Sequence, residues 1–403
     1  MSQHLATQDA DHLVHGMGVE PAAPDWPPLT VAELDGLLAR YPEAGGAQRV
    51  HWRSPRPLSA AALVQASSGA RLFVKRHNIG VRTPQSLAEE HAFLGHLGRN
   101  GAPVVRVLRT ADAGADADES GHGSGGGTVA VSDDGQWTYE VHTVGEGEDV
   151  YRDAISWSPF RSLEHARSAG RILARLHRAS AGYDAPARAA APLVGGLTVF
   201  GDPGHDPIAA SRRYVAARPA LAGFLEHRDW RSDFERWHLP FFTRLAPHLD
   251  ELEPLWTHND LHASNLLWHG REAATVIDFN LADRAFAVHD LALVIERNAV
   301  EWLELEAGGE AAVHADAAAE IIAGYEEVRR LTEAERAALP ELLPLCHVDF
   351  ALSELDYFAG VTRNRENAEL AYRYLVDHAA WFADGTGKAL LQRVRRVLTS
   401  SRA

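Results

Sequence analysis

The stretch WTHNDLHASNLL at residues 256–267, followed by VIDF at residues 276–279, determines how the rest of this sequence is interpreted. It places Asn265 five residues after Asp260 and ends its last apolar run on a second aspartate, Asp278. Phosphoryl transfer needs such a set, because one carboxylate orients the attacking hydroxyl while an amide oxygen and another carboxylate hold Mg²⁺ against nucleotide phosphates. The stretch therefore predicts a phosphotransferase catalytic loop.

The interval from His258 to Asn265 supports this prediction, since protein kinases use H-R-D-x-x-x-x-N with Asp as base and Asn as metal ligand. The residues that follow predict a hairpin, with strands at 266–268 and 274–277 around a turn at 269–271. Such a hairpin would return Asp278 to the side of Asn265, as a shared metal site requires.

Two other interpretations fit part of this stretch. His258 and His262 stand four residues apart and could bind zinc from one helix face, as in H-E-x-x-H. However, Asn259 occupies the position of the glutamate that activates water, and the following residues predict a strand. Alternatively, a polar turn ahead of a buried strand would use the Asp and Asn only for turn hydrogen bonds, which leaves the rest of the pattern unexplained.

Composition narrows the class of protein. A chain of 403 residues with 46% apolar and 23% charged residues is long enough for two lobes with substantial cores. Its 55 acidic and 39 basic residues give a net charge of −16, which argues against a nucleic-acid or anionic-membrane partner and is compatible with a cationic substrate.

Cysteine content and hydropathy indicate the compartment. The single cysteine, Cys346, excludes an intramolecular disulfide framework and is interpreted as a small buried apolar residue. No stretch approaches eighteen apolar residues, and residues 1–25 are polar without the apolar centre of a signal peptide. We therefore expect a cytoplasmic protein without membrane partners; no feature specifies an oligomeric state.

The patterns along the chain predict an α+β protein. Residues 1–28 read as a flexible tail, residues 29–143 as a strand-rich lobe and residues 144–403 as a mainly helical lobe. An Ala/Asp/Gly/Ser-rich segment at 111–127 predicts a mobile surface loop. Further patterns predict helices opening at Thr30 and over 83–98 and 163–177, and strands over 49–53, 62–66, 71–75, 104–108, 128–132 and 136–142.

The first lobe offers the remaining parts of a nucleotide site. The apolar strand LFVK ends on Lys75, the residue type that contacts nucleotide phosphates, although a lysine at a strand end is commonly solvated. The helix over 83–98 carries Glu90, with Glu89 as the neighbouring alternative. An ion pair between Lys75 and Glu90 would hold a kinase nucleotide site in register.

These motifs together resemble the aminoglycoside phosphotransferase/choline kinase superfamily of kinase-like enzymes. The resemblance rests on VK at 74–75, E-x-x-x-L-x-x-L at 90–97, GAPV at 101–104, A-x-LH at 174–177, H-x-DLH-x-x-NLL at 258–267, IDF at 277–279 and DLA at 290–292. It implies a two-lobed protein-kinase-like fold, with a small antiparallel sheet and one main helix in the first lobe and a larger helical second lobe. It also implies ATP as co-substrate and Mg²⁺ as cofactor.

The resemblance implies roles for individual residues. Asp260 is the base or orienter of the acceptor hydroxyl, Asn265 and Asp278 are the Mg²⁺ ligands, and Lys75 contacts the nucleotide phosphates. Further roles are structural or adenine-binding: His258 supports the loop, Asp290 accepts hydrogen bonds from its backbone, and 139–142, with Glu140 and His142, is the hinge.

The sequence departs from the family pattern at three places. Asn259 stands where the family usually has glycine, and asparagine tolerates unusual backbone angles. Asn280 follows the metal aspartate where a second acidic residue or glycine is common, which weakens a second metal ligand there. The expected phosphate-covering loop at 54–61 contains no glycine.

The acceptor implied by the resemblance is an alcohol hydroxyl of a small molecule, such as an aminoglycoside, an amino alcohol or a homoserine-like amino acid. Small-molecule members of the family place acidic residues on late helices, and here Asp349 and Asp356 share one helical face among aromatic residues. A solvated acidic face is the alternative interpretation of this pair.

Two other functions remain compatible with the sequence. EEHAFL at 89–94 and PVV at 103–105 resemble bacterial stress-type Ser/Thr protein kinases. A non-catalytic kinase-like binding module is the second, and it is disfavoured because such a module has no need to retain Lys75, Asp260, Asn265 and Asp278 together.

Overall fold

The computed structural model describes residues 13–15, 21–111, 127–188, 192–201, 204, 206–306 and 308–400. The mobile loop predicted at 111–127 lies almost entirely outside these residues. By internal contacts the chain divides into two compact units: Met1–Arg99 with Val104–Gly145, and Asn100–Pro103 with Glu146–Ala403.

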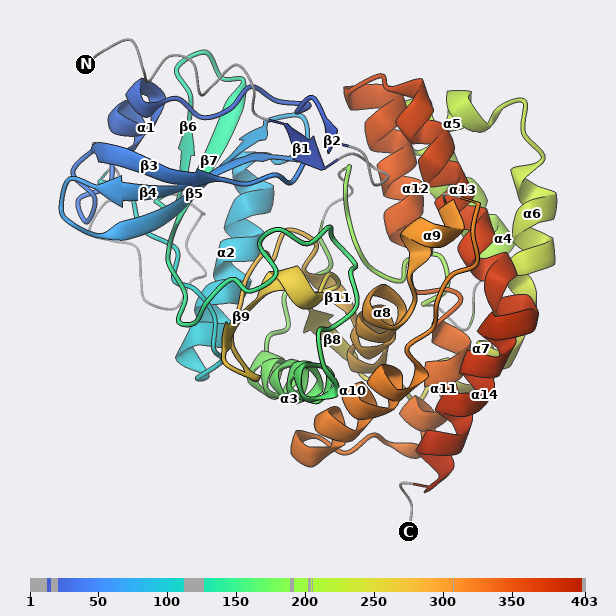
Figure 1. Cartoon of the computed structure of the whole chain (residues 1–403). Helices are drawn as coiled ribbons and strands as arrows, with labels where there is room; N and C mark the ends of the chain where they lie inside the picture. Colours follow the sequence, from blue (N-terminus) through green and yellow to red (C-terminus); the bar gives the residue numbers. More distant parts are fainter. Residues whose placement is uncertain are drawn as a thin grey trace. The chain divides into compact units, whose positions relative to one another are not determined.

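A five-stranded antiparallel sheet forms the first unit (Figure 1). Its strand order is β3-β4-β5-β7-β6. The β4–β5 turn passes through Gly69, whose φ of +90° is a conformation that glycine adopts without steric cost. The strands are β3 (Ala47–Arg53), β4 (Ala60–Ala66), β5 (Arg71–Asn78), β6 (Val129–Val131) and β7 (Trp137–Thr143).

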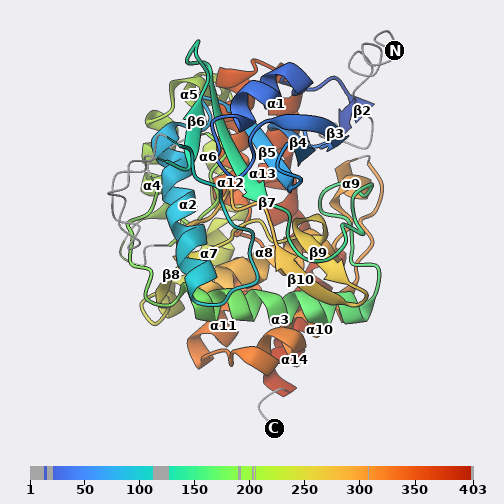
Figure 2. The same cartoon turned by 90° about the vertical axis from the view of Figure 1, so that its left-hand side faces the viewer.

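Two helices complete this unit, both predicted from the sequence. Helix α1 (Val31–Leu38) begins with the expected capping box, in which Thr30 and Glu33 satisfy each other's backbone amides. Its buried leucines share one apolar core with β4 and β5, and α1 and the sheet lie side by side in both views (Figure 1, Figure 2). Helix α2 (Pro84–Arg99) carries Glu90 among its buried residues.

Two expectations about the first unit need correction. Residues 104–108 are not a strand: Val107 forms only an isolated bridge to His142, because this segment pairs with β7 for a few residues where β6 has ended. The tail is partly structured as well, since β1 (Val14–His15) and β2 (Pro21–Ala22) pair with each other and Trp26 packs edge-on against Trp137 at 5.6 Å.

The second unit contains two short antiparallel strand pairs that position the predicted loop. Strand β8 (Pro254–Thr257) pairs with β11 (Asp283–Phe286), and β9 (Leu266–His269) pairs with β10 (Glu272–Val276). The predicted hairpin is therefore confirmed, and its turn includes Gly270 at φ +59°. The 3₁₀ turn η1 (Ala263–Asn265) connects the loop to β9.

Helices make up most of the second unit. Helices α3 and α10 approach each other closely at two glycines, Gly170 and Gly324. A Cβ atom on Gly170 would lie 2.1 Å from the Ile321 carbonyl oxygen, and one on Gly324 would lie 1.9 Å from the Arg167 carbonyl oxygen, so only glycine fits at these positions. All thirteen residues of α8 are buried, so this helix is the centre of the unit. The helices are α3 (Leu163–Ser180), α4 (Pro207–Ala216), α5 (Pro219–Leu225), α6 (Trp230–Trp237), α7 (Leu239–Leu249), α8 (Ala287–Ala299), α9 (Trp302–Glu306), α10 (Ala315–Val328), α11 (Glu333–Leu342), α12 (Val348–Asp356), the π-helical η2 (Tyr357–Val361), α13 (Arg365–Ala383) and α14 (Gly385–Ser400).

The expected α+β class is present in these two units. Among the described residues, no helix is both long enough and apolar enough to cross a membrane.

Candidate active site

The predicted catalytic loop leaves β8 through a left-handed turn at Asn259. The φ of this residue is +60°, a conformation that asparagine tolerates better than most side chains. Its side chain secures the turn, accepting from the Thr257 hydroxyl at 2.8 Å and donating to the Leu281 carbonyl at 3.2 Å. Asparagine can therefore replace glycine here while adding contacts that glycine lacks.

The Asp290 carboxylate on α8 anchors this turn. One oxygen accepts the backbone amide of His258 at 2.8 Å and the other accepts that of Asn259 at 3.0 Å. His177 on α3 donates a third hydrogen bond at 3.0 Å. Burial alone would raise the pKa of Asp290, but the hydrogen bonds and positive charge around it hold that pKa below its usual value.

His258 is held in one tautomer by the loop. Its Nε2 donates to the Ile277 carbonyl at 3.0 Å, and its Nδ1 accepts the backbone amide of Asp260 at 3.2 Å. Burial lowers the pKa of His258, which favours the neutral ring that these two contacts require. This histidine is thus a brace between the loop and the residue that precedes Asp278.

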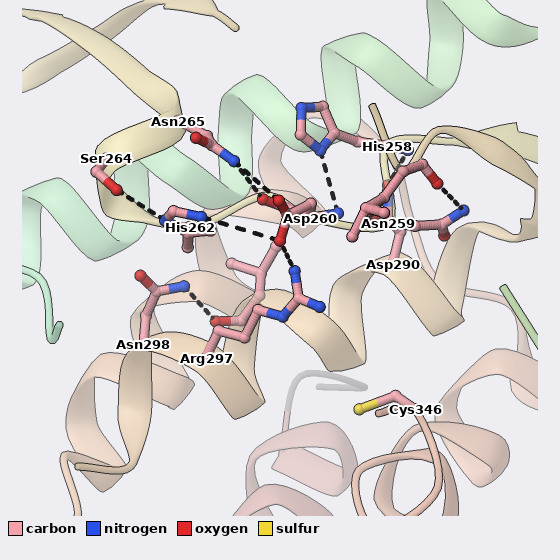
Figure 3. A network of polar contacts seen from close by, with 12 residues as sticks. His258, Asn259, Asp260, His262, Ser264, Asn265, Asp290, Arg297, Asn298 and Cys346 are labelled. Carbon is pink, nitrogen blue, oxygen red and sulfur yellow. Dashed lines mark hydrogen bonds and ion pairs between the residues drawn. The ribbon is translucent and has the colours of Figure 1, made fainter. Parts of the chain in front are cut away.

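Asp260 presents its carboxylate between two partners (Figure 3). Its Oδ2 receives the Asn265 amide nitrogen at 3.3 Å, while its Oδ1 receives the Nη1 of Arg297. The Nε2 of His262 lies 3.9 Å from the same Oδ1. The Asp260 side chain keeps 20% of its surface exposed, so a substrate hydroxyl can approach a carboxylate whose orientation is already set.

The β9–β10 hairpin brings the backbones of Asn265 and Asp278 close to each other. Leu266 pairs with Val276, and the Ile277 amide donates to the Asn265 carbonyl at 3.0 Å, which leaves Asp278 one residue beyond this bond. Asp278 itself has a left-handed φ of +65°. A non-glycine residue held in this conformation is a frequent feature of functional sites.

The donor atoms of this pair suit a divalent cation of the Mg²⁺ type. The Asn265 amide nitrogen also donates to the Asp260 carbonyl at 2.9 Å, so its amide oxygen points away from Asp260 (Figure 3). An amide oxygen together with a carboxylate forms the hard oxygen donor set that Mg²⁺ prefers. Asn265 and Asp278 are therefore the residues that would hold the metal.

Sequence reasoning missed two residues of α8 that contact the loop. Arg297 meets Asp260, and the Asn298 side chain accepts the Ala263 amide at 2.9 Å while donating to the Val294 carbonyl at 2.7 Å. A signal was available: Arg297 and Asn298 are consecutive polar residues near the end of a helix that is buried on every side. Consecutive polar residues in such a helix need partners, and the loop supplies them.

In the first unit the predicted nucleotide residues lie on neighbouring elements. Lys75 on β5 and Glu90 on α2 are both buried, at 8% and 2% exposure. Lys75 is directly opposite Glu140 in the β5–β7 register. The ion pair between Lys75 and Glu90 stays a prediction.

The expected hinge at 139–142 is not supported by the structure. Glu140 pairs with Lys75 on one side of β7 and with Val129 on the other, and His142 pairs with Phe73 and Val107. Their backbone groups are therefore committed to the sheet and unavailable to adenine. The sequence pattern predicted the strand but not that β7 would be an interior strand.

The Glu140 side chain has a different role, since it is fully buried among three histidines. It accepts His77 Nε2 at 2.8 Å on one oxygen, and His142 Nε2 at 2.8 Å and His91 Nε2 at 3.0 Å on the other. Burial would raise the pKa of Glu140, but the histidines, with His142 foremost, hold it well below its usual value. This cluster is a polar core for the first unit.

Asp349 and Asp356 on α12 were expected to face an acceptor, and the structure gives Asp349 a different role. Both oxygens of the Asp349 carboxylate accept backbone amides, those of Thr198 at 2.5 Å and Val199 at 3.2 Å, and the residue is 2% exposed. Asp349 therefore fastens the segment around Thr198 and is not available to an acceptor. Asp356, at the end of α12, is half-buried, and burial raises the pKa of its carboxyl.

Comparison with known proteins identifies a matching family and several relatives in sequence. Residues 58–331 match the model of the phosphotransferase enzyme family. An uncharacterized protein of Deinococcus radiodurans is 29% identical over 295 residues, which cover 72% of each chain. A homoserine kinase of Granulibacter bethesdensis is 28% identical over 207 residues, 49% of this chain and 54% of the relative, so the chain spans about half the length of that enzyme.

Among solved structures, a choline/ethanolamine kinase family protein of Mesorhizobium loti superposes with a TM-score of 0.53. It is 14% identical, and the match covers 91% of this chain and 99% of that one. The shared fold confirms the expected kinase-like architecture, and the family match confirms the resemblance that the motifs indicated.

Proposed function

Because this chain belongs to the phosphotransferase enzyme family, we propose that it transfers the γ-phosphoryl group of ATP to an alcohol hydroxyl of a small molecule. Mg²⁺ is the proposed metal cofactor. The observation that carries the proposal is the Asp260 carboxylate, oriented by Asn265 and Arg297 and still partly exposed.

In this proposal Asp260 accepts the hydrogen bond of the acceptor hydroxyl and takes its proton as the oxygen attacks phosphorus. The carboxylate needs no reorganisation for that step, since its two oxygens already have fixed neighbours. A positioned general base contributes typically about 10²–10⁴ in rate. His258 and Asp290 act through the loop backbone and never meet the reacting atoms.

Asn265 and Asp278 would hold Mg²⁺, which when bound neutralises charge on the nucleotide phosphates. Asn265 would then have two functions, because its amide nitrogen donates to Asp260 and its amide oxygen would be available to the metal. Lys75 is the proposed phosphate contact in the first unit, with Glu90 as its proposed ion-pair partner.

A small-molecule acceptor is favoured over a protein substrate by the homoserine kinase of Granulibacter bethesdensis, whose acceptor is a small hydroxyl compound. A purely binding role is disfavoured because a binding module has no use for a partly exposed aspartate oriented in this way.

The test is ATP consumption by the purified full chain against amino alcohols, aminoglycosides, hydroxy amino acids and a generic protein substrate, with products identified by mass spectrometry. We expect Mg²⁺-dependent ADP formation with a phosphorylated small molecule. Phosphorylation of the protein substrate alone, or no transfer to any acceptor, would contradict the proposal.

A further inference from the structure

Arg297 is buried beside the proposed catalytic base, and only one edge of its guanidinium is occupied. The side chain has 0% exposure, and its Nη1 meets the Oδ1 of Asp260. Its Nε and Nη2 are also buried, yet neither has a hydrogen-bond partner among the described residues. A buried donor without a partner is costly, so two on one cation require an explanation.

The two unoccupied donors lie on the same edge of the guanidinium. Nε–H and Nη2–H point in parallel, which makes them the fork that binds a carboxylate through two hydrogen bonds. Nη1 points elsewhere, toward Asp260 (Figure 3). Arg297 can therefore keep its contact with Asp260 and still hold a second oxyanion.

Aromatic side chains lie beside the Arg297 guanidinium. The guanidinium carbon lies 5.2 Å from the ring centre of Trp157 and 5.4 Å from that of Phe350. The ring of Tyr374 is 5.2 Å from that of Trp157, and its buried hydroxyl interacts with the Arg297 side chain without a hydrogen bond of ordinary geometry. Aromatic walls around a few unsatisfied polar groups are typical of a small-ligand site.

The position of Arg297 relative to Asp260 indicates which ligand this is. Asn265, a proposed metal ligand, contacts the Oδ2 of Asp260, whereas Arg297 contacts Oδ1 (Figure 3). The guanidinium therefore lies on the side of the base away from Asn265. A group bound there belongs to the molecule whose hydroxyl meets Asp260, and not to the nucleotide that the metal accompanies.

We infer that Arg297 binds a carboxylate of the phosphoryl acceptor, and that the acceptor is a small hydroxy acid or hydroxy amino acid. This inference rests on the proposed function, because it names the substrate class of the same site. Since Arg297 contacts Asp260 directly, the hydroxyl and carboxylate of the acceptor must lie close together, separated by about three or four carbons at ordinary hydrogen-bond distances.

A purely structural ion pair explains the geometry less well. To orient Asp260 the protein needs one donor, and Nη1 supplies it. Burial lowers the pKa of Arg297, because a charged guanidinium is costly away from water, and a second oxyanion would offset that cost. An acceptor carboxylate would satisfy both remaining donors.

The experiment compares matched acceptors with the purified full chain and MgATP. The carboxylates L-homoserine, L-serine, L-threonine and 4-hydroxybutyrate are each measured against their carboxamides. We expect kcat/KM to favour the best carboxylate over its amide by about 10²-fold or more, since a site built to hydrogen-bond a group strongly rejects the analogue without it. The Arg297→Met variant should reduce this ratio to nearly one, chiefly through KM, and Arg297→Lys should retain part of it.

A second buried arginine provides the control. Arg336 on α11 bonds the Leu398 carbonyl at 2.8 Å and pairs with Glu326, away from the loop. Arg336→Met removes a buried guanidinium in the same way and should leave the carboxylate-to-amide ratio unchanged, whatever its effect on stability. Equal kcat/KM of the wild type for a carboxylate and its carboxamide overturns the inference. A carboxylate-to-amide ratio that is unchanged in Arg297→Met also overturns it.

Equilibrium binding separates this inference from the proposed function. Calorimetry with the same carboxylates, Mg²⁺ and a non-hydrolysable ATP analogue reports on the site without turnover. Carboxylate binding that Arg297→Met abolishes, without any phosphoryl transfer, supports the inference and contradicts the proposed function. Transfer to a hydroxyl of amino alcohols or sugars, with no binding of any carboxylate, supports the function and overturns the inference.

Discussion

Asp290 accepts the backbone amide of His258 at 2.8 Å, so a carboxylate on α8 sets the position of the residue two before Asp260. The same helix supplies Arg297 to the Asp260 carboxylate and Asn298 to the turn that follows it. The predicted catalytic loop is therefore attached to a fully buried helix at three points. An active site supported in this way is preorganised by the core.

Replacing Asp290 with asparagine tests this attachment. One oxygen becomes an NH₂ group that must face a backbone amide or His177, which leaves buried donors opposed. We expect the free energy of unfolding to fall by about 2–4 kcal/mol. Urea denaturation measures it, with Asp316→Asn as the control because that carboxylate is 76% exposed. Equal effects of the two substitutions would rule out the anchoring role.

Replacing Asp278 with asparagine tests the metal assignment. The substitution preserves the size of the side chain and removes one anionic donor, so we expect the Mg²⁺ concentration needed for half-maximal activity to rise by about 10-fold or more. Titration of ADP formation against Mg²⁺ measures this change. An unaltered Mg²⁺ requirement would place the metal elsewhere.

Asp283 should make stability depend on pH. Burial raises its pKa from 3.8 to about 6, while its Oδ1 accepts the amides of Arg188 and Arg284. The folded protein then binds this proton more tightly than the unfolded chain, so the carboxyl's contribution to stability is greatest below pH 3.8 and is lost as pH rises through 6.

Asp283→Asn removes that titration and keeps an oxygen for both amides. Relative to wild type, the variant should gain about 2–3 kcal/mol in unfolding free energy between pH 4 and pH 7.5. Denaturant unfolding of both proteins at the two pH values gives this difference. A difference that does not change with pH would contradict the raised pKa.

Glu140→Gln tests the polar core of the first unit. The amide cannot accept from three histidines, so we expect a loss of about 2–4 kcal/mol and faster hydrogen exchange along β7. Glu43→Gln is the matched control, because Glu43 is 51% exposed and pairs with Arg106, and it should cost under about 1 kcal/mol. Comparable losses would show that the histidine cluster contributes no special stability.

Local sequence patterns correctly predicted the structural features that depend on residues close together in the sequence. The β9–β10 hairpin follows from apolar runs on either side of Gly270, and it places Asp278 next to Asn265. The capping box at Thr30 and the start of α2 at Pro84 are local signals of the same kind. The proposed metal pair could therefore be predicted without knowledge of the fold.

Contacts between residues far apart in the sequence determine the features that could not be predicted. Arg297 is 37 residues from Asp260 in sequence, and nothing in either segment specifies that they meet. The three histidines around Glu140 come from β5, α2 and β7, so the sequence around Glu140 alone could not predict this cluster. Residues 139–142 suggested a hinge, whereas in the structure they form an interior strand. Asp349 has the helical spacing expected of a binding face, but amides of a segment 150 residues earlier occupy it.

Asp260 is the proposed base for phosphoryl transfer to a small-molecule hydroxyl. The most direct test of this role is single-turnover transfer by Asp260→Asn, which keeps the size of the side chain and removes its basicity. We predict that transfer slows by about 10²–10⁴-fold while the affinity for the ATP analogue and the melting temperature stay close to wild type. Transfer at the wild-type rate in this variant would contradict the account.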